Sequence, residues 1–116
     1  MHTHLQTVDR YMNGFRHSDH AMILGCLTDD VVWRIHGLRS TNGKAEFDDE
    51  IENPAFEGSP ELAVERTIEA DNVVVVTGTG AGHRRETGPF RFAYSDLFTF
   101  QDGLIAQVDS YVVPLA

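Results

Sequence analysis

Between residues 90 and 100 aromatic side chains alternate with other residues, and no other segment constrains the fold as strongly. Alternation with period two predicts a β-strand whose aromatic side chains all lie on one face of a sheet. A face this apolar must be covered by other elements, so the strand is expected to form a wall of the core. One carboxylate, Asp96, interrupts the aromatic row, which otherwise consists of Phe90, Phe92, Tyr94, Phe98 and Phe100.

The covering elements are expected near the start of the chain, where the hydrophobic pattern is helical. Apolar residues at three- to four-residue spacing predict a first amphipathic helix, which Thr3 can cap. A second, shorter helix is predicted over residues 20–27 and a third over residues 43–52. The apolar stripe of the first helix consists of Leu5, Val8, Met12 and Phe15.

The remaining segments are predicted as strands, which gives the element order α-α-β-α-β-β-β-β. Helices and strands segregated in this way form an α+β domain, in which a curved antiparallel β-sheet wraps around the three helices. The chain has 116 residues and fits one domain, residues 1–116. The predicted strands cover residues 31–35, 62–69, 73–79, 90–100 and 104–113.

The charge balance excludes several classes of partner. Eighteen acidic residues against nine basic ones give a net charge of −9, which repels nucleic-acid phosphates and anionic membrane surfaces. The longest apolar run, residues 73–76, is too short to cross a membrane, and no secretory signal is expected. Cys26 is the only cysteine, so we expect neither an internal disulfide nor a thiolate metal cluster. The sequence therefore favours a cytoplasmic protein without a bound metal.

Asp96 is the residue whose position points most directly to chemistry. Burial among aromatic side chains raises the pKa of a carboxyl group, and a neutral carboxylic acid can donate a hydrogen bond to a developing oxyanion. The alternative is a structural aspartate that bonds to backbone donors or to an arginine. Arg66 is the arginine that could pair with Asp96, because it shares a predicted strand face with Leu62 and Ile68. An ion pair with Arg66 would lower the pKa of Asp96 and remove its role as a donor.

Tyr11 and His36 are the two other candidates for acid–base work. Tyr11 lies beside the apolar stripe of the first helix, so its ring can pack in the core while its hydroxyl enters a pocket. The alternative for Tyr11 is core packing alone. His36 follows the first predicted strand, and histidine is the usual general base near neutral pH. Strand alternation places His36 on the face opposite Trp33 and Ile35, so it faces a pocket only if the strand bends there.

Gly78, Gly80 and Gly82 alternate along a predicted strand and imitate a dinucleotide-binding loop. No helix is predicted after them, so the pattern is interpreted as part of a β-hairpin and not as a phosphate cradle. Arg84 and Arg85, which follow, are expected at the solvated tip of that hairpin.

Short motifs are spread over most of the chain: Asp9-Arg10-Tyr11, Ser18-Asp19, Leu27-Thr28-Asp29-Asp30-Val31, Gly43-Lys44-Ala45, and Ser95-Asp96-Leu97-Phe98-Thr99-Phe100 followed by Asp102-Gly103-Leu104-Ile105. Together with the element order they resemble the nuclear transport factor 2-like (NTF2-like) superfamily, and within it the SnoaL-like and ketosteroid-isomerase-like group. The resemblance covers nearly the whole chain and implies a cone-shaped fold around an apolar pocket. It also implies a homodimer that pairs through the exposed face of the sheet.

The resemblance implies roles for three residues. Tyr11 matches the tyrosine of ketosteroid isomerases that donates a hydrogen bond to the substrate oxyanion, and Asp96 matches their second donor, a protonated aspartate. Ile35 stands where those enzymes carry the aspartate that acts as the general base, and isoleucine cannot move a proton. In SnoaL-type cyclases a single aspartate resembling Asp96 acts as acid and base, which needs no second carboxylate.

Three functions follow from these observations. The first is a cofactor-independent enzyme of isomerase, cyclase or dehydratase type, in which Asp96 and Tyr11 act on a small, largely apolar carbonyl compound with His36 as a reserve base. The second is a module that binds such a molecule without chemistry, and the third is a dimeric interaction module whose pocket its own side chains fill. Residues expected to bind the ligand are Phe15, Trp33, Ile35, Phe47, Ile51, Arg66, Phe92, Tyr94, Phe98 and Val108.

Overall fold

Helix α1 (His4–His17) is the first element of the computed structural model, which describes residues 3–115. Thr3 caps α1 as predicted, because its hydroxyl accepts a hydrogen bond from a backbone N–H of the first turn. Helix α2 (His20–Leu24) is shorter than predicted, whereas helix α3 (Gly43–Ile51) follows the prediction closely. Within the described part of the chain, no helix has both the length and the apolar character needed to cross a membrane.

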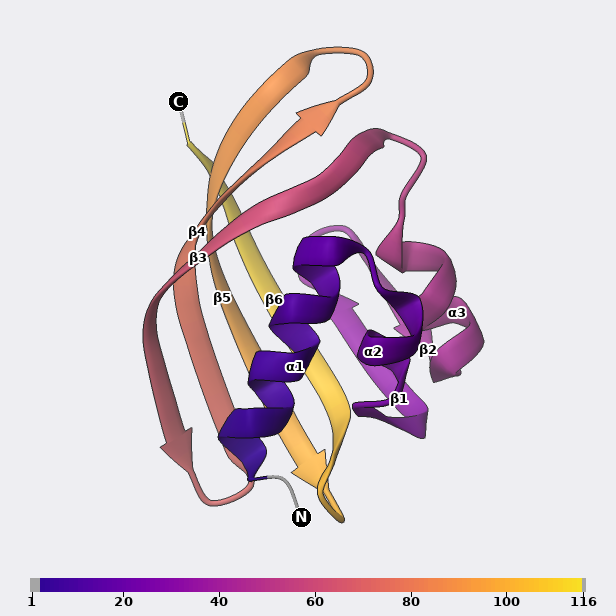
Figure 1. Ribbon diagram of the computed structural model, residues 1–116, viewed down its shortest axis with the longest axis vertical. Coiled ribbons are helices and arrows are strands. Elements are labelled where there is room, and N and C mark those ends of the chain that lie inside the picture. Colours follow the sequence, from indigo (N-terminus) through magenta and orange to yellow (C-terminus); the bar gives the residue numbers. More distant parts are fainter. Residues whose placement is uncertain (1–2, 116) are drawn as a thin grey trace.

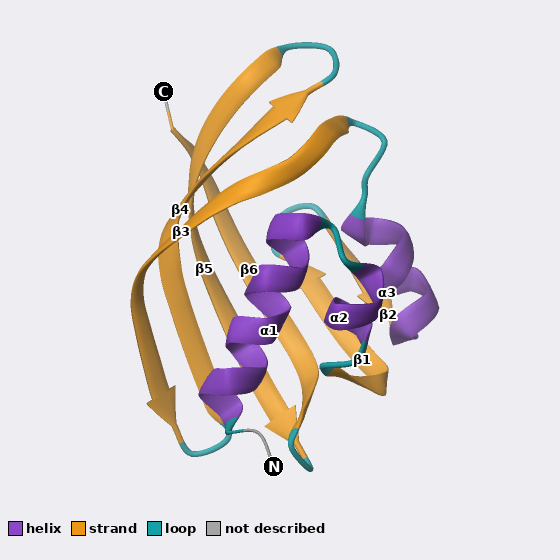
Figure 2. Cartoon of the chain, viewed as in Figure 1, coloured by secondary structure: helices purple, strands orange, loops and turns teal. Residues whose placement is uncertain are grey.

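A six-stranded sheet curls around these helices, with the strand order β2-β1-β6-β5-β4-β3. Figures 1 and 2 show α1 crossing one face of the sheet, with α2 and α3 on the same side near β1 and β2. The predicted α+β arrangement of three helices against a curved sheet is therefore confirmed. The strands are β1 (Leu27–Ile35), β2 (Arg39–Asn42), β3 (Phe56–Ala70), β4 (Val73–Arg84), β5 (Gly88–Gln101) and β6 (Leu104–Leu115).

Two features of the sheet differ from the prediction. The sheet is mixed and not wholly antiparallel, because β1 pairs in parallel with β6, the last strand of the chain. Local patterning predicts that a segment is a strand, but it does not say which distant strand lies beside it. The short strand β2 was also not predicted, since its sequence Arg-Ser-Thr-Asn shows no apolar alternation. It forms an antiparallel hairpin with β1 across Gly37, whose φ of 85° only glycine adopts readily.

A bulge in β3 reverses the direction of Arg66. Val64 lies opposite Gly78 and Arg66 lies opposite Thr77, so Glu65 is an extra residue on β3. The insertion moves Arg66 onto the outer face, because one added residue changes which face each later side chain occupies. The expectation that Arg66 lies on the pocket face is wrong, and its side chain is exposed. No ion pair joins Arg66 to Asp96 among residues 3–115.

The core lies between the helices and the concave face of the sheet, as the aromatic row of β5 predicts. Tyr94, Phe98 and Phe100 are buried in it, whereas Phe90 and Phe92 keep partial exposure. Phe47 of α3 is fully buried and stacks on Trp33 of β1 with ring centroids 4.6 Å apart. The wider core cluster also contains Val8, Tyr11, Met12, Ile23, Cys26, Leu27, Val31, Val74, Val76, Ile105 and Val108.

His20 connects α2 to α3 through two carboxylates. Its Nδ1 contacts Asp48, and its Nε2 lies 2.6 Å from Oε2 of Glu52. The hydrogen bond to Asp48, followed by that to Glu52, raises the pKa of His20 above its ordinary value of 6.5. A raised histidine pKa means that the protonated form stabilises the fold. That contribution is fully present below pH 6.5 and is lost as the pH rises through the folded-state pKa.

We therefore expect an NMR titration to give a pKa above 6.5 for His20 in the wild type and a lower value in Asp48→Asn. Raising the pH through that pKa should also lower the stability of the wild type relative to His20→Gln, measured by urea unfolding. Equal pKa values for His20 in the wild type and in Asp48→Asn would contradict this account of the α2–α3 junction.

Candidate functional site

A cavity of about 410 Å³ opens between the helices and the sheet. Side chains of α1, β1, β5 and β6 form its inner end, and this group consists of Tyr11, Trp33, Tyr94, Asp96 and Ser110. The exposed rim runs from the β1–β2 turn past the end of α3 to the β4–β5 hairpin. The volume lies in the range of small-molecule sites, so the aromatic side chains leave the pocket open and do not fill it.

A row of glycines on β4 makes room for the aromatic wall of the cavity. A Cβ atom at Gly80 would come within 2.3 Å of the Phe92 ring, and one at Gly78 within 2.9 Å of the Tyr94 hydroxyl. The rings of β5 lie across β4 because that strand carries no side chains at these positions. The register pairs are Gly78 with Tyr94, Gly80 with Phe92 and Gly82 with Phe90. The alternating glycines are thus a packing feature that shapes the cavity, as part of the hairpin that was predicted.

Asp96 lines the inner end of this cavity on β5 and keeps partial exposure there. Burial raises the pKa of its carboxyl group to about 6, and a hydrogen bond with Ser110, its neighbour on β6, opposes the rise. The direction of the shift agrees with the sequence analysis. At pH 7, however, a group with this pKa is protonated in about one molecule in ten. Asp96 is therefore suited to accept and return a proton near neutral pH more than to remain a neutral donor.

Two tyrosine hydroxyls lie near this carboxylate. Tyr11 is buried, and burial together with the charge of Asp96 raises its pKa well above the ordinary value of 10.0. Tyr94 is affected by the same two causes, which raise its pKa to about 12. Both phenols therefore stay protonated and can donate hydrogen bonds. The Tyr11 hydroxyl makes no hydrogen bond within residues 3–115, whereas the Tyr94 hydroxyl lies 3.5 Å from the Ala63 carbonyl.

Trp33 and Ser110 form a support beneath Asp96. The Trp33 Nε1–H donates a hydrogen bond to the Ser110 hydroxyl oxygen over 3.0 Å. The Ser110 oxygen is the acceptor in this hydrogen bond. Its own hydroxyl hydrogen therefore remains available to point toward Asp96 on the adjacent strand. Trp33 was expected to line the pocket and does so. The role of Ser110 was missed, because its position opposite Asp96 depends on the pairing register of two strands and on no local motif.

Most of the residues expected at the site line the cavity together, but five lie elsewhere. Phe15, Ile35, Ile51 and Phe92 join Tyr11, Trp33, Tyr94 and Asp96 in its lining. Phe98, Phe47 and Val108 are fully buried behind the wall, so the prediction that they line the pocket is wrong. The two remaining residues, His36 and Arg66, lie outside the cavity altogether.

His36 lies on the outer face of the sheet, as strand alternation favours. Its Nε2 lies 2.9 Å from Oδ1 of Asp109, and its ring stacks on Tyr111 with centroids 4.2 Å apart. Both partners alternate with Ser110 along β6, so they point away from the cavity. The idea of His36 as a reserve base is therefore wrong, because it does not reach the cavity that Asp96 lines.

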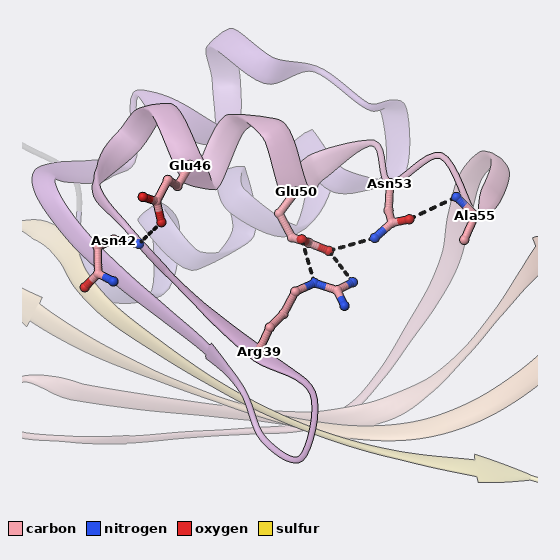
Figure 3. Close-up of polar contacts among 6 residues, drawn as sticks. All are labelled: Arg39, Asn42, Glu46, Glu50, Asn53 and Ala55. Carbon is pink, nitrogen blue, oxygen red and sulfur yellow. Dashed lines mark hydrogen bonds and ion pairs between the residues drawn. The ribbon is translucent and has the colours of Figure 1, made fainter.

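The rim of the cavity carries charged side chains that sequence analysis did not place there. Figure 3 shows Arg39 of β2 bound to Glu50 of α3, and both of its hydrogen bonds are 2.8 Å long. The same figure shows Asn53 donating to Glu50 and accepting from the Ala55 backbone N–H, which fixes the turn after α3. Arg84 is exposed at the β4–β5 hairpin, as expected, and it also lines the rim of the cavity. No cluster of three or more histidine, cysteine or acidic side chains suited to a metal occurs in the described residues.

Comparisons with known proteins agree with this architecture. A family model of the SnoaL-like domain matches residues 8–108. No curated protein sequence gives a significant match. Among solved structures, an NTF2-like protein of unknown function from Burkholderia pseudomallei superposes with a TM-score of 0.83 at 22% identity, covering 95% of this chain and 90% of that one.

Two further neighbours carry more specific descriptions. An LEH-like epoxide hydrolase of Mycobacterium tuberculosis gives a TM-score of 0.81 at 18% identity, covering 94% of this chain and 81% of that one. A hypothetical protein with a ketosteroid isomerase-like fold from Catenulispora acidiphila, in complex with trimethylamine, gives 0.82 at 13% identity, covering 91% and 84%. At these identities the likeness shows the fold alone.

Proposed function

Because the chain belongs to the SnoaL-like domain family of the NTF2-like superfamily, we propose that it is a cofactor-independent acid–base enzyme of isomerase, cyclase or dehydratase type. Its substrate is a small, largely apolar carbonyl compound held in the cavity. The observation that carries the proposal is that Asp96 and Tyr11 both line the inner end of a cavity with aromatic walls. Perturbed carboxyl groups in clefts are typical of catalytic sites.

The chemistry is a proton transfer next to a carbonyl group. The Asp96 carboxylate takes a proton from the carbon beside the carbonyl, and the C–H electron pair moves to form an enolate. The Tyr11 hydroxyl donates a hydrogen bond to the enolate oxygen and so stabilises the charge that develops there. Asp96 then returns the proton to the same or another carbon, so no oxidant or reductant is consumed. A carboxyl group with a pKa of about 6 suits both directions near neutral pH.

Binding without turnover is the second candidate, and the side chain at position 35 favours it. Ile35 lines the cavity and has no group that moves a proton. If Asp96 only orients the ligand, the protein binds carbonyl compounds without changing them. A homodimer that pairs through the outer face of the sheet stays a prediction in either case.

Hydrogen–deuterium exchange separates these candidates directly. We expect the wild type to accelerate exchange of the α-hydrogens of 2-tetralone, a flat apolar ketone, in D₂O followed by NMR. Tyr11→Phe should slow the exchange about tenfold or more, because it removes a donor to the enolate oxygen while keeping the ring. A wild type that binds the ketone without accelerating exchange would favour the binding module. A parallel reaction with styrene oxide tests the activity named for the M. tuberculosis neighbour.

A further inference from the structure

Arg84 lies at the rim of the cavity on a platform of two aromatic rings. It is the last residue of β4, and it lies opposite Phe56 of β3 in the sheet register. Its guanidinium carbon is 5.0 Å from the centroid of the Phe56 ring and 4.5 Å from that of Phe90. Arg84 also continues the alternation of Gly80 and Gly82, so it belongs to the face of β4 that carries the cavity wall. Cation–π contacts of this kind hold a guanidinium group in place without using its N–H donors.

The other charged groups at the rim are engaged by protein partners. Arg39 binds Glu50 through two hydrogen bonds. Arg85 donates to the Pro54 carbonyl over 2.9 Å and reaches a glutamate of β3. Glu52, another acid in the cavity lining, contacts His20 of α2.

Arg84 differs from these residues, because no hydrogen bond or ion pair within residues 3–115 uses its side chain. Its five N–H donors are therefore free on the rim of an apolar cavity, held in position by the two rings. A planar, oriented guanidinium group matches the geometry of a carboxylate, which it binds through two parallel hydrogen bonds.

We propose that the ligand of this cavity is an elongated apolar keto acid, whose carboxylate binds Arg84 at the rim while its carbonyl group reaches Asp96 and Tyr11. The inference rests on the proposed function only for the position of the carbonyl end. Asp96 lies six positions after Phe90 along β5, which corresponds to about 20 Å of extended strand before curvature shortens it. An aromatic wall thus separates Asp96 and Tyr11 at one end of the cavity from Arg84 at the other. The proposed ligand matches this order, with a carbonyl group at one end, an apolar middle and a carboxylate at the other end.

A matched pair of probes tests the charge at the rim. 4′-Acetylbiphenyl-4-carboxylate is flat, carries a methyl ketone at one end and a carboxylate at the other, and its carboxamide differs only in lacking the charge. We expect the wild type to bind the carboxylate about three- to tenfold more tightly than the carboxamide at low salt, measured by calorimetry. The preference should shrink in 0.5 M NaCl, because Arg84 is exposed and salt screens its charge.

Three variants assign the preference to Arg84. Arg84→Gln should bind both probes equally, and Arg84→Lys should keep part of the preference because it keeps the charge. Arg91→Gln removes the same charge from the same hairpin, but Arg91 alternates with Phe90 and Phe92 and so lies on the outer face. It should keep the full preference. Equal affinities of the wild type for both probes, or a preference that survives in Arg84→Gln, would overturn the proposal.

The same probes keep this proposal separate from the proposed function. Exchange of the methyl-ketone hydrogens in D₂O reports on Asp96 and Tyr11, whereas the carboxylate preference reports on Arg84. A preference that depends on Arg84 without any exchange supports the ligand class and removes the enzymatic function. Exchange on both probes with equal affinity supports the enzyme and removes the carboxylate site.

Discussion

Replacing Asp96 by asparagine is expected to stabilise the fold at neutral pH. The carboxyl pKa rises from its ordinary 3.8 to about 6 in the folded protein, so the folded state binds this proton more tightly than the unfolded chain does. Stability therefore falls as the pH rises from about 4 to about 6, and above that range the ionised side chain costs about 3 kcal/mol. Asparagine has nearly the same shape and no charge, so it avoids this cost.

Urea unfolding at two pH values measures the effect. We expect Asp96→Asn to exceed the wild type in free energy of unfolding by up to about 3 kcal/mol at pH 7.5, and by little near pH 4. Asp49→Asn is the matched control, because Asp49 is exposed on α3, and it should change stability by less than about 0.5 kcal/mol at either pH. A loss of stability in Asp96→Asn at pH 7.5 would show that the carboxylate is satisfied by its surroundings.

The same substitution should lower the rate of α-hydrogen exchange about 10²–10⁴-fold, because it removes the group that moves the proton. A variant that is more stable and inactive is the combination expected of a group kept for chemistry at a cost to the fold. Full exchange activity in Asp96→Asn would exclude Asp96 as the proton carrier.

Replacing Phe47 by alanine is expected to cost about 3–5 kcal/mol of stability. Phe47 is fully buried, stacks on Trp33 and meets the edge of Tyr11, with ring centroids 6.2 Å apart. Its removal therefore leaves a void behind two side chains that line the cavity. The milder Phe47→Leu keeps most of the volume and should cost less than about 1.5 kcal/mol.

Urea unfolding of both Phe47 variants measures this cost, with Leu38→Ala as the control. Leu38 is 71% exposed at the rim, so truncating it should change stability by less than about 0.5 kcal/mol. Similar losses in Phe47→Ala and Leu38→Ala would contradict the view that Phe47 supports the cavity wall.

Local patterns predicted the fold class and the inner end of the site. The aromatic row of β5 indicated which face is buried, and the interruption at Asp96 marked the carboxylate that faces the cavity. Both follow from strand alternation, which acts over a few residues. The stripe of α1 placed Tyr11 in the core by the same kind of argument, with helical period. The sequence also predicted the direction of the Asp96 pKa shift, because burial raises the pKa of a carboxyl group.

What alternation could not predict were the places where it is broken or where distant strands meet. The bulge at Glu65 turned Arg66 to the outer face, because one extra residue shifts the phase of everything after it. Alternation also could not predict that β1 pairs in parallel with β6, because it does not say which distant strands lie side by side.

The periodicity of nearby residues was thus enough to predict the kinds of element, the buried faces and the acid at the inner end of the cavity. Long-range packing was needed to show that Ser110 lies opposite Asp96 and that Arg84 rests on two rings at the rim. These contacts join residues far apart in the chain, and they depend on strand register and sheet curvature, which no local pattern encodes.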